Sequence, residues 1–357
     1  MRLWQRRPLM KLIYQIGRLE RGAFNPIKFE VHGKVYEALL SSFALKQSFL
    51  ENGEDAKVIL IYPISLFLNK IAPQIENISE DFKQTIEGVL KNENERFNYL
   101  SNPYPYFAKH PHSEEAYDFI VIHSIGEYED INFSATLEEL ILEIFIDMVR
   151  RYQNEPFSEL YLDISSGHNI YVSALLEAGR LFLTFYKLQN WNSKESGLDV
   201  YIVFSDPILP PYDRIFKIHK EFRLEVKTFF SFPEKPSQDK LENAFSKFSK
   251  DLIGNVIELR PLKRQLNELF SHGYFFYSAI KNNCPLVLYT WEYQEEEIDR
   301  GINDLLNLVY QRLYKDYQKT PGLKFDLFRK AFLMLSIYKG IVKVLKEYKI
   351  FKKKRSN

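Results

Sequence analysis

One short run of residues carries the side chains best suited to binding a ligand. Residues 163–169 read Asp-Ile-Ser-Ser-Gly-His-Asn and follow an apolar run that predicts a strand. Four of these positions supply polar groups: Asp163, Ser165, Ser166 and Asn169. Gly167 would let the backbone approach a ligand closely. An ordinary strand-to-helix turn with serine caps needs the same residue types, so both interpretations stay open on spacing alone.

Other candidate ligand-binding residues stand where predicted strands end or helices begin: Gly17, Arg18, Ser41, Ser42, His123 and Ser124. Ligands of open parallel sheets bind beyond the carboxyl ends of the strands, where helix N-termini offer free N–H groups. An arginine beside glycine at such an end suits a phosphate, although a solvated or ion-paired arginine is more common. The chain contains no GxGxxG and no Walker lysine at these points, which disfavours a dinucleotide enzyme or a P-loop NTPase.

A second cluster of polar side chains lies near residue 265. Arg260, Arg264 and Asn267 are spaced by four and three residues and would share one face of a helix, with His272 just over a turn further on. A histidine with basic neighbours could cleave RNA without metal, by moving a proton at the 2′-hydroxyl while cations stabilise the phosphorane. The alternative is that His272 caps a helix end or belongs to the core.

The elements that must position these residues alternate along the first 230 residues. Strands are predicted over residues 12–16, 57–62, 119–122, 160–163 and 200–204, a hairpin over 28–37, and helices over 41–49, 137–152 and 170–188. This alternation indicates a Rossmann-like, mainly parallel sheet. From residue 238 the apolar spacing becomes mostly helical, and only residues 286–291 are ambiguous. We therefore expect two domains, 10–235 and 238–357, with a boundary at 234–237.

Composition narrows the functional classes. The 357 residues carry a net charge of +1, and basic residues gather only at the start (Arg2, Arg6, Arg7) and in the tail from Lys349 to Arg355. A single cysteine, Cys284, excludes an internal disulfide framework and a Cys-rich zinc site. We see neither an apolar run of about 20 residues nor a signal peptide, and we expect a soluble cytoplasmic protein whose natural start is Met1 or Met10.

Three motifs occur in an order that resembles a known family. They are residues 39–45 (LLSSFAL), residues 62–66 (YPISL) after an apolar strand, and residues 163–169 (DISSGHN). Together they resemble the CRISPR-associated CARF-domain proteins of type III systems, particularly the CARF–HEPN ancillary ribonucleases. The resemblance implies a homodimer whose CARF domains bind a cyclic oligoadenylate, such as cyclic tetra-adenylate, at the strand-end residues named above. It also implies metal-independent cleavage of single-stranded RNA by helical HEPN domains, with no cofactor.

The helical half departs from the family pattern. The HEPN signature places an arginine four to six residues before the histidine and a polar residue after the arginine. With His272 as the histidine and Asn267 as the polar residue, the arginine position is Leu266. Either Arg264 substitutes from a shifted helix, or the nuclease activity is reduced or lost. In the latter case the chain would sense the messenger and signal to a partner, and a third possibility is that the CARF pocket itself degrades the messenger.

Overall fold

The computed structural model describes most of the chain. The described residues are 10–20, 22–69, 75–128, 131–192, 197–208, 213–228, 230–238, 240–289, 292–293, 295–313, 317, 319 and 322–350, without the side chains of 221 and 222. Met1 and the basic residues that gather at the two ends of the sequence lie outside these ranges, apart from Lys349. Met10 is the first residue of the first strand.

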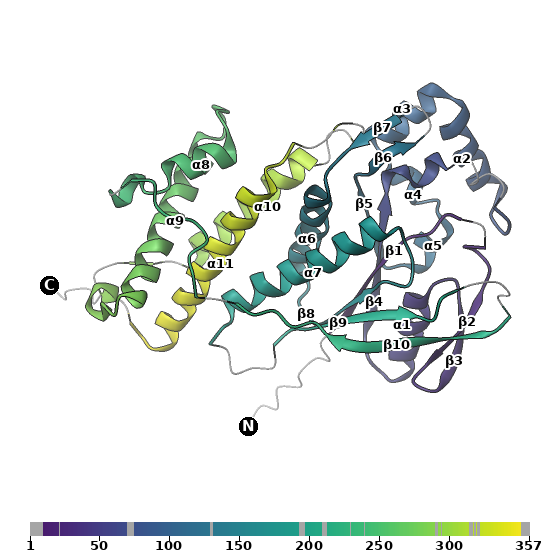
Figure 1. Cartoon of the computed structure of the whole chain (residues 1–357), viewed down its shortest axis with the longest axis horizontal. Coiled ribbons are helices and arrows are strands. Elements are labelled where there is room, and N and C mark those ends of the chain that lie inside the picture. The colour runs from purple at the N-terminus through teal and green to yellow at the C-terminus, as the bar shows by residue number, and fades with distance from the viewer. Residues whose placement is uncertain are drawn as a thin grey trace. The chain divides into compact units, whose positions relative to one another are not determined.

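Eight strands form one sheet in the order β3-β2-β10-β9-β8-β1-β4-β5 (Figure 1). Their bounds are β1 Met10–Ile16, β2 Ile27–Val31, β3 Lys34–Ala38, β4 Ala56–Pro63, β5 Asp118–Ile122, β8 Phe157–Asp163, β9 Asp199–Ser205 and β10 Ile215–Arg223. A separate hairpin pairs β6 Ile125–Tyr128 with β7 Ile131–Ser134. β9, β8, β1, β4 and β5 run parallel, whereas β10 is antiparallel to β9. The predicted Rossmann-like sheet, followed by a mostly helical part, is confirmed.

The order of these strands creates one switch point. β1 leads to β4 and β5 on one side, and the chain then crosses to β8 and β9 on the other side of β1. Loops from neighbouring strands diverge at such a point and leave room for a ligand beyond the carboxyl ends. The loop at residues 163–169 follows β8 directly, so it lies at this switch point.

Helices cover both faces of the sheet, which explains why the central strands read as continuous apolar runs. The helices of this half are α1 Ser41–Glu51, α2 Glu80–Lys91, α3 Glu93–Ser101, α4 Tyr104–Phe107, α5 Pro111–Glu115, α6 Leu137–Asn154 and α7 Asn169–Gln189, with a 3-10 helix η1 at Ile64–Leu68. Tyr161 of β8 packs its ring on Phe49 of α1. Its neighbour Leu162 packs against Gly179 of α7, so α1 and α7 lie on opposite faces.

Local sequence signals account for several of these elements. The predicted hairpin is β2 and β3, and its two turn residues His32 and Gly33 have φ angles of 51° and 80°, which suits a tight hairpin turn. Thr136 and Glu139 form a capping box that starts α6. Leu40 is the N-cap of α1 and makes no side-chain cap bond, and the hydroxyl of Ser41, the first residue of the helix, donates to Asp163 instead.

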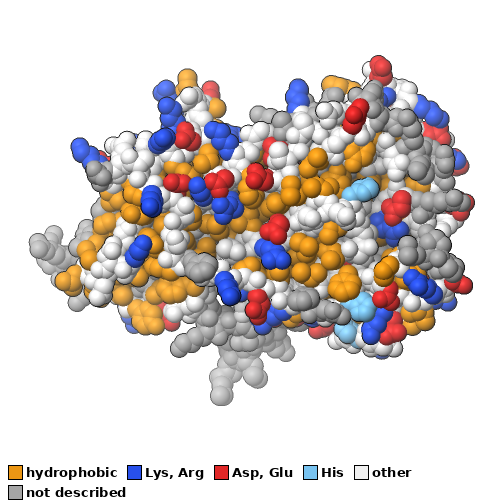
Figure 2. Space-filling view, in the orientation of Figure 1, with side chains coloured by type: hydrophobic (Ala, Val, Ile, Leu, Met, Phe, Trp, Pro, Cys, Tyr) orange, Lys and Arg blue, Asp and Glu red, His pale blue; other side chains and the backbone are white. Residues whose placement is uncertain are grey.

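The remaining elements are helical. They are η3 Leu241–Asn243, α8 Ser246–Ile253, α9 Arg260–Lys281, η4 Pro285–Tyr289, α10 Glu295–Leu313 and α11 Phe325–Glu347. The ambiguous run near residue 288 is therefore the 3-10 helix η4. No helix within the described ranges is both long and apolar enough to cross a membrane. In Figure 2, acidic and basic side chains of the described residues intermingle rather than gather by sign on the face shown.

Contacts divide the chain into two compact units that interleave along the sequence. The first unit, here the sheet unit, comprises residues 1–180, 198–225 and 312–322. The second, the helical unit, comprises residues 181–197, 226–311 and 323–357. The predicted boundary at 234–237 lies within residues 226–311 of the helical unit. The division into domains 10–235 and 238–357 stays a prediction. Helix α7 is therefore divided between the units: its residues up to 180 belong to the sheet unit and those from 181 on belong to the helical unit.

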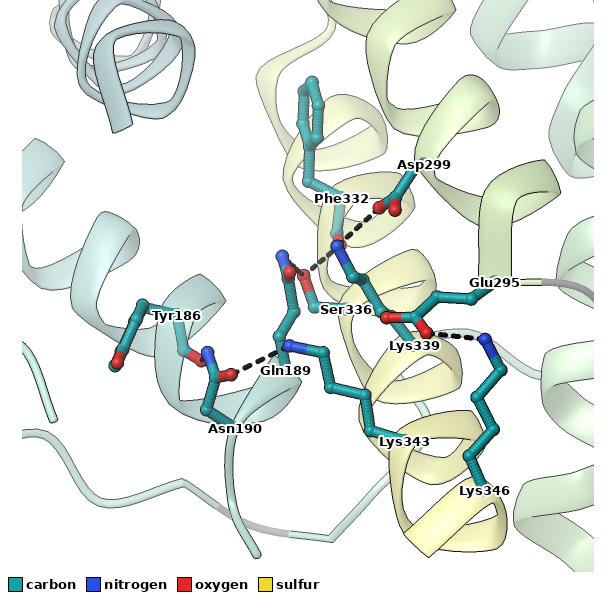
Figure 3. A network of polar contacts seen from close by, with 10 residues as sticks. All are labelled: Tyr186, Gln189, Asn190, Glu295, Asp299, Phe332, Ser336, Lys339, Lys343 and Lys346. Atoms are coloured by element: carbon teal, nitrogen blue, oxygen red, sulfur yellow. Dashed lines mark hydrogen bonds and ion pairs between the residues drawn. The ribbon is translucent and has the colours of Figure 1, made fainter. Parts of the chain in front are cut away.

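Within the helical unit, the end of α7 packs closely on α11 (Figure 3). Gln189 donates to the Ser336 hydroxyl at 3.4 Å, and the Lys343 ammonium donates to the Asn190 amide oxygen at 2.9 Å. A Cβ on Gly340 would lie 2.1 Å from the carbonyl oxygen of Leu188. Glycine is therefore required where these two helices meet.

Candidate functional site

The loop after β8 is held against the end of β1 by a glycine and a serine. Gly167 has a φ of 106°, and a Cβ there would lie 2.7 Å from the Ile16 Cβ. The neighbouring Ser166 hydroxyl donates to the Ile16 carbonyl at 2.8 Å. Only glycine fits this backbone conformation and this approach without strain, so the loop position depends on Gly167.

Asp163 is the hub of the hydrogen bonds below this loop. Its side chain is fully buried and accepts from the Ser41 hydroxyl at 2.7 Å, the Ser165 N–H at 2.9 Å and the Ser165 hydroxyl at 2.5 Å. Burial raises the pKa of Asp163, and the hydroxyls of Ser165 and Ser41 partly offset that rise. The carboxyl group thus fixes the loop rather than reaching out to a ligand.

Gln15 is a site residue that the sequence analysis missed. Its amide nitrogen donates to the Ser41 hydroxyl at 2.9 Å and to the Ser166 hydroxyl at 3.0 Å, and its oxygen accepts from the Ser42 N–H at 3.2 Å. One side chain therefore joins β1, the start of α1 and the loop after β8. The only signal in the sequence is a polar residue within the apolar strand of residues 12–16.

Ser42 brings an unsatisfied group to the same place. Its side chain is fully buried, and its hydroxyl has no hydrogen-bond partner among the described residues. A buried hydroxyl left unpaired costs about 1–3 kcal/mol, so such groups are typically completed by water or a ligand. This unpaired hydroxyl lies in the first turn of α1, next to the Ser42 N–H that donates to Gln15.

The outer rim of the loop is open to solvent. Gly167, His168 and Asn169 are exposed, and Asn169 begins α7. The first N–H groups of a helix this long carry partial positive charge and attract phosphate oxygens. The predicted site residues around residue 163 therefore separate into a buried frame and an exposed rim, and the rim is the part a ligand can touch.

Gly17 and Arg18 continue β1 next to this frame. A Cβ on Gly17 would lie 2.1 Å from the Tyr62 ring, so Gly17 serves close packing of the strand end. Arg18 keeps 12% of its side chain exposed and forms an ion pair with Glu20 at 2.5 Å. An anionic ligand at Arg18 would compete with the Glu20 carboxylate.

His123 and Ser124 lie buried at the end of β5. The His123 imidazole bonds to the Glu143 carboxylate of α6, which also accepts from the His123 N–H at 3.0 Å. The Ser124 hydroxyl donates to the Ser65 hydroxyl at 2.9 Å and accepts from the Ser65 N–H at 3.0 Å. Both residues are at most 1% exposed, so their contacts are internal, and their predicted ligand role stays a prediction.

The switch-point geometry agrees with a comparison against known protein families. Residues 11–207, more than half of the 357-residue chain, match the family described as CRISPR system endoribonuclease Csx1, CARF domain. The chain belongs to the Csx1 CARF family. Its CARF domain indicates cyclic-oligoadenylate sensing in type III CRISPR defence. A comparison with curated proteins found no match.

The Csx1 CARF match ends at residue 207, and the second candidate cluster lies beyond it on α9. A cavity of about 490 Å³ in the helical unit is lined by Arg264, Asn267, Ser271 and His272, together with Glu242 and Glu268. Burial lowers the pKa of His272, and the negative charges of Glu268 and Glu297 oppose that change. A neutral imidazole at the wall of a polar cavity is suited to accept a proton.

The other predicted catalytic residues have structural partners. The Asn267 amide donates to the Glu242 carbonyl at 2.7 Å and accepts from the Phe245 N–H at 3.2 Å, which ties the segment before α8 to α9. Arg264 is largely exposed and pairs with Glu268 at 3.0 Å. Both nevertheless line the cavity, and their catalytic assignments stay predictions.

Helix α9 is continuous from Arg260 to Lys281, which settles the local geometry around His272. His272 stands inside the helix, so the alternative of a cap near a helix end is wrong. Seven residues of regular helix lie between Arg264 and His272, and eight rises of about 1.5 Å place them about 12 Å apart along the axis. Leu266, at the position expected for the motif arginine, is fully buried. Among the described residues, no group of three or more His, Cys, Asp or Glu side chains could hold a metal ion.

Proposed function

We propose that the chain is a homodimeric receptor for a cyclic oligoadenylate, and that binding of this messenger switches on cleavage of single-stranded RNA by its helical half. The receptor part rests on the loop at residues 163–169. This loop brings the exposed residues Gly167, His168 and Asn169 to the start of α7, while Asp163 and Gln15 hold it by hydrogen bonds.

This arrangement suits a ring of phosphates and adenines. Phosphate oxygens accept from the first N–H groups of α7, and Gly167 lets the loop that leads to them lie close against Ile16. Arg18 offers a bidentate partner to a phosphate once its pair with Glu20 opens. Cyclic tetra-adenylate is the messenger that we propose, and it is the ligand used in the experiments below.

For the output, His272 acts as the general base or acid of a metal-independent endoribonuclease. The observation that carries this assignment is its place on the wall of a 490 Å³ cavity together with Arg264, Asn267 and Ser271. With its pKa below the ordinary value of 6.5, the imidazole is uncharged at neutral pH and can take the proton of a 2′-hydroxyl. Arg264 is the nearest candidate in sequence to stabilise the phosphorane charge.

The deciding experiment is an RNA cleavage assay with labelled single-stranded RNA, with and without cyclic tetra-adenylate. We expect cleavage only with the messenger, and a loss of at least about a hundredfold in His272→Ala, because a general base contributes that much. Messenger binding should not change in this variant. His32→Asn is the matched control: it removes a histidine from the β2–β3 turn, where asparagine tolerates the positive φ, and should cleave normally. Full cleavage by His272→Ala would overturn the assignment.

A second function is favoured by the departure at Leu266. With that side chain buried and Arg264 about 12 Å from His272 along α9, the arginine and histidine of one chain do not form a close pair. The chain would then bind the messenger without cleaving RNA and signal to a partner. Messenger binding with intact RNA would support this function, and loss of the intact ring during incubation would instead support degradation of the messenger in the CARF pocket.

A further inference from the structure

A tyrosine from the connection between α10 and α11 is buried in the sheet unit. α10 ends at Leu313 and α11 begins at Phe325, and residues 312–322, which include the end of α10 and most of this connection, are grouped with the sheet unit. Tyr317 is only 2% exposed and belongs to the same apolar core as the strands β4 and β5. One residue of the connection between α10 and α11 is thus buried in the core of the sheet unit.

Three contacts fix Tyr317. Its N–H donates to the Leu100 carbonyl at 3.3 Å, and its hydroxyl donates to the Val121 carbonyl of β5 at 3.3 Å. Its ring stacks on the His123 imidazole, with centroids 4.9 Å apart and planes inclined by 22°. Tyr317 therefore contacts the end of strand β5, the residue that follows this strand, and the end of helix α3.

His123 connects this tyrosine to the candidate messenger site. The Glu143 carboxylate bonds to its Nδ1 and the ring is buried, so the stacked ring has little freedom. The next residue, Ser124, bonds to Ser65 and is a neighbour of the buried Tyr171 hydroxyl, in the first turn of α7. That turn follows the loop at residues 163–169 directly. A displacement of this loop would therefore reach Tyr317 by way of Tyr171, its neighbour Ser124 and the adjacent residue His123.

We propose that Tyr317 is a positioning residue that couples the carboxyl edge of the sheet to α10 and α11, so that a shift of that edge changes how the two helices are held. It does so by its stacking on His123 and its hydrogen bonds to Val121 and Leu100. A shift of the end of β5 moves the anchor of the α10–α11 connection and so changes the stability of the first turn of α11. The messenger-dependent part rests on the function proposed above, whereas the coupling itself does not.

The coupling is tested by hydrogen–deuterium exchange on the full chain without messenger. His123→Gln keeps a donor for Glu143 but removes the ring on which Tyr317 stacks. We expect it to raise exchange in the first turn of α11 about tenfold, as local opening becomes easier. In the Tyr317→Leu background the same change at His123 should have almost no further effect, because the two residues act through one contact. Effects that simply add would overturn the proposal.

Two controls separate coupling from loss of folding. Tyr310→Leu removes a comparable ring from the exposed face of α10 and should leave the effect of His123→Gln on α11 intact. Tyr317→Phe keeps the stacking and loses only the bond to Val121, so it should behave between the natural chain and Tyr317→Leu. If the first turn of α11 does not respond to His123→Gln in any background, Tyr317 carries no signal.

The messenger arm repeats the measurement with cyclic tetra-adenylate. In the natural chain, binding should change exchange in the first turn of α11, and Tyr317→Leu should bind with similar affinity but lose this change. An equal change in both proteins would refute the proposal. Absence of binding to the natural chain would instead refute the proposed function, while the messenger-free cycle would still decide the coupling.

Discussion

Replacing Gly167 with alanine tests the candidate messenger site most directly. The residue has a φ of 106°, where a side chain costs about 1–3 kcal/mol. The new Cβ would also lie 2.7 Å from the Ile16 Cβ, on a strand that cannot move easily because it pairs with β4 and β8 on either side. The loop, rather than β1, must therefore shift.

The size of the effect follows from what the shift breaks. Ser166 donates to the Ile16 carbonyl at 2.8 Å and accepts from Gln15 at 3.0 Å, and each bond contributes about 1 kcal/mol. Loss of both bonds is expected to weaken the binding free energy of the messenger by about 2 kcal/mol. The Kd then rises roughly thirtyfold, since 1.4 kcal/mol corresponds to a factor of ten. Titration calorimetry with cyclic tetra-adenylate measures this change directly.

Gly33→Ala provides the matched control. Gly33 also has a positive φ, 80°, but a Cβ there meets nothing within 4 Å. This variant should lose about 1 kcal/mol of unfolding free energy and bind the messenger with unchanged affinity. Urea unfolding of both variants separates stability from binding. If Gly167→Ala binds as tightly as Gly33→Ala, the loop is not the messenger site.

Three further predictions concern groups inside the two units. Asp163→Ala strands the hydroxyls and N–H that bond to the carboxylate and should lower the unfolding free energy by about 3 kcal/mol; a loss below about 1 kcal/mol would contradict its role as the hub. Burial lowers the pKa of His112 from 6.5 to about 4, so the folded state favours the neutral ring. The free energy of unfolding that this ring contributes is therefore complete above pH 6.5, and it falls by about 3 kcal/mol as the pH drops to 4. In urea unfolding, His112→Gln should flatten that slope, and parallel curves would refute the assignment. Gly340→Ala should destabilise the helical unit by about 1–3 kcal/mol. Gly88→Ala in α2, whose Cβ would make only an ordinary contact of 3.9 Å with Glu95, should be neutral or stabilising in the same thermal unfolding assay.

The sequence predicts the central sheet well because its strands are covered on both sides. Residues 57–62 and 160–163 are continuous apolar runs, and continuous runs bounded by turns and helices indicate parallel strands. β10 escaped prediction because charged residues interrupt its apolar positions. Phe216 and Ile218 are buried and Lys217 is exposed, a pattern of period two that the flanking basic residues obscure.

The site was predicted less completely than the fold, for reasons of distance along the chain. The partners of Gln15 are 26 and 151 residues away, and one polar residue in a strand gives no direction toward them. His123 was expected to face a ligand because it ends a strand. Its partner Glu143 lies on α6, 20 residues later, and no spacing rule relates the two. Tyr317 gives no local signal at all, since its burial arises from strands nearly 200 residues earlier.

The interleaving of the two units has a consequence for how such a chain can evolve. A fragment ending at residue 235 would keep residues 181–197 without the α11 side chains that cover Phe185 and Gln189. It would also leave the sheet unit without the ring of Tyr317. Each half alone exposes apolar surface that the other stretches of sequence normally bury. Recombination that exchanges one helical half for another is therefore penalised, and the sheet unit and the helical unit are expected to be inherited together.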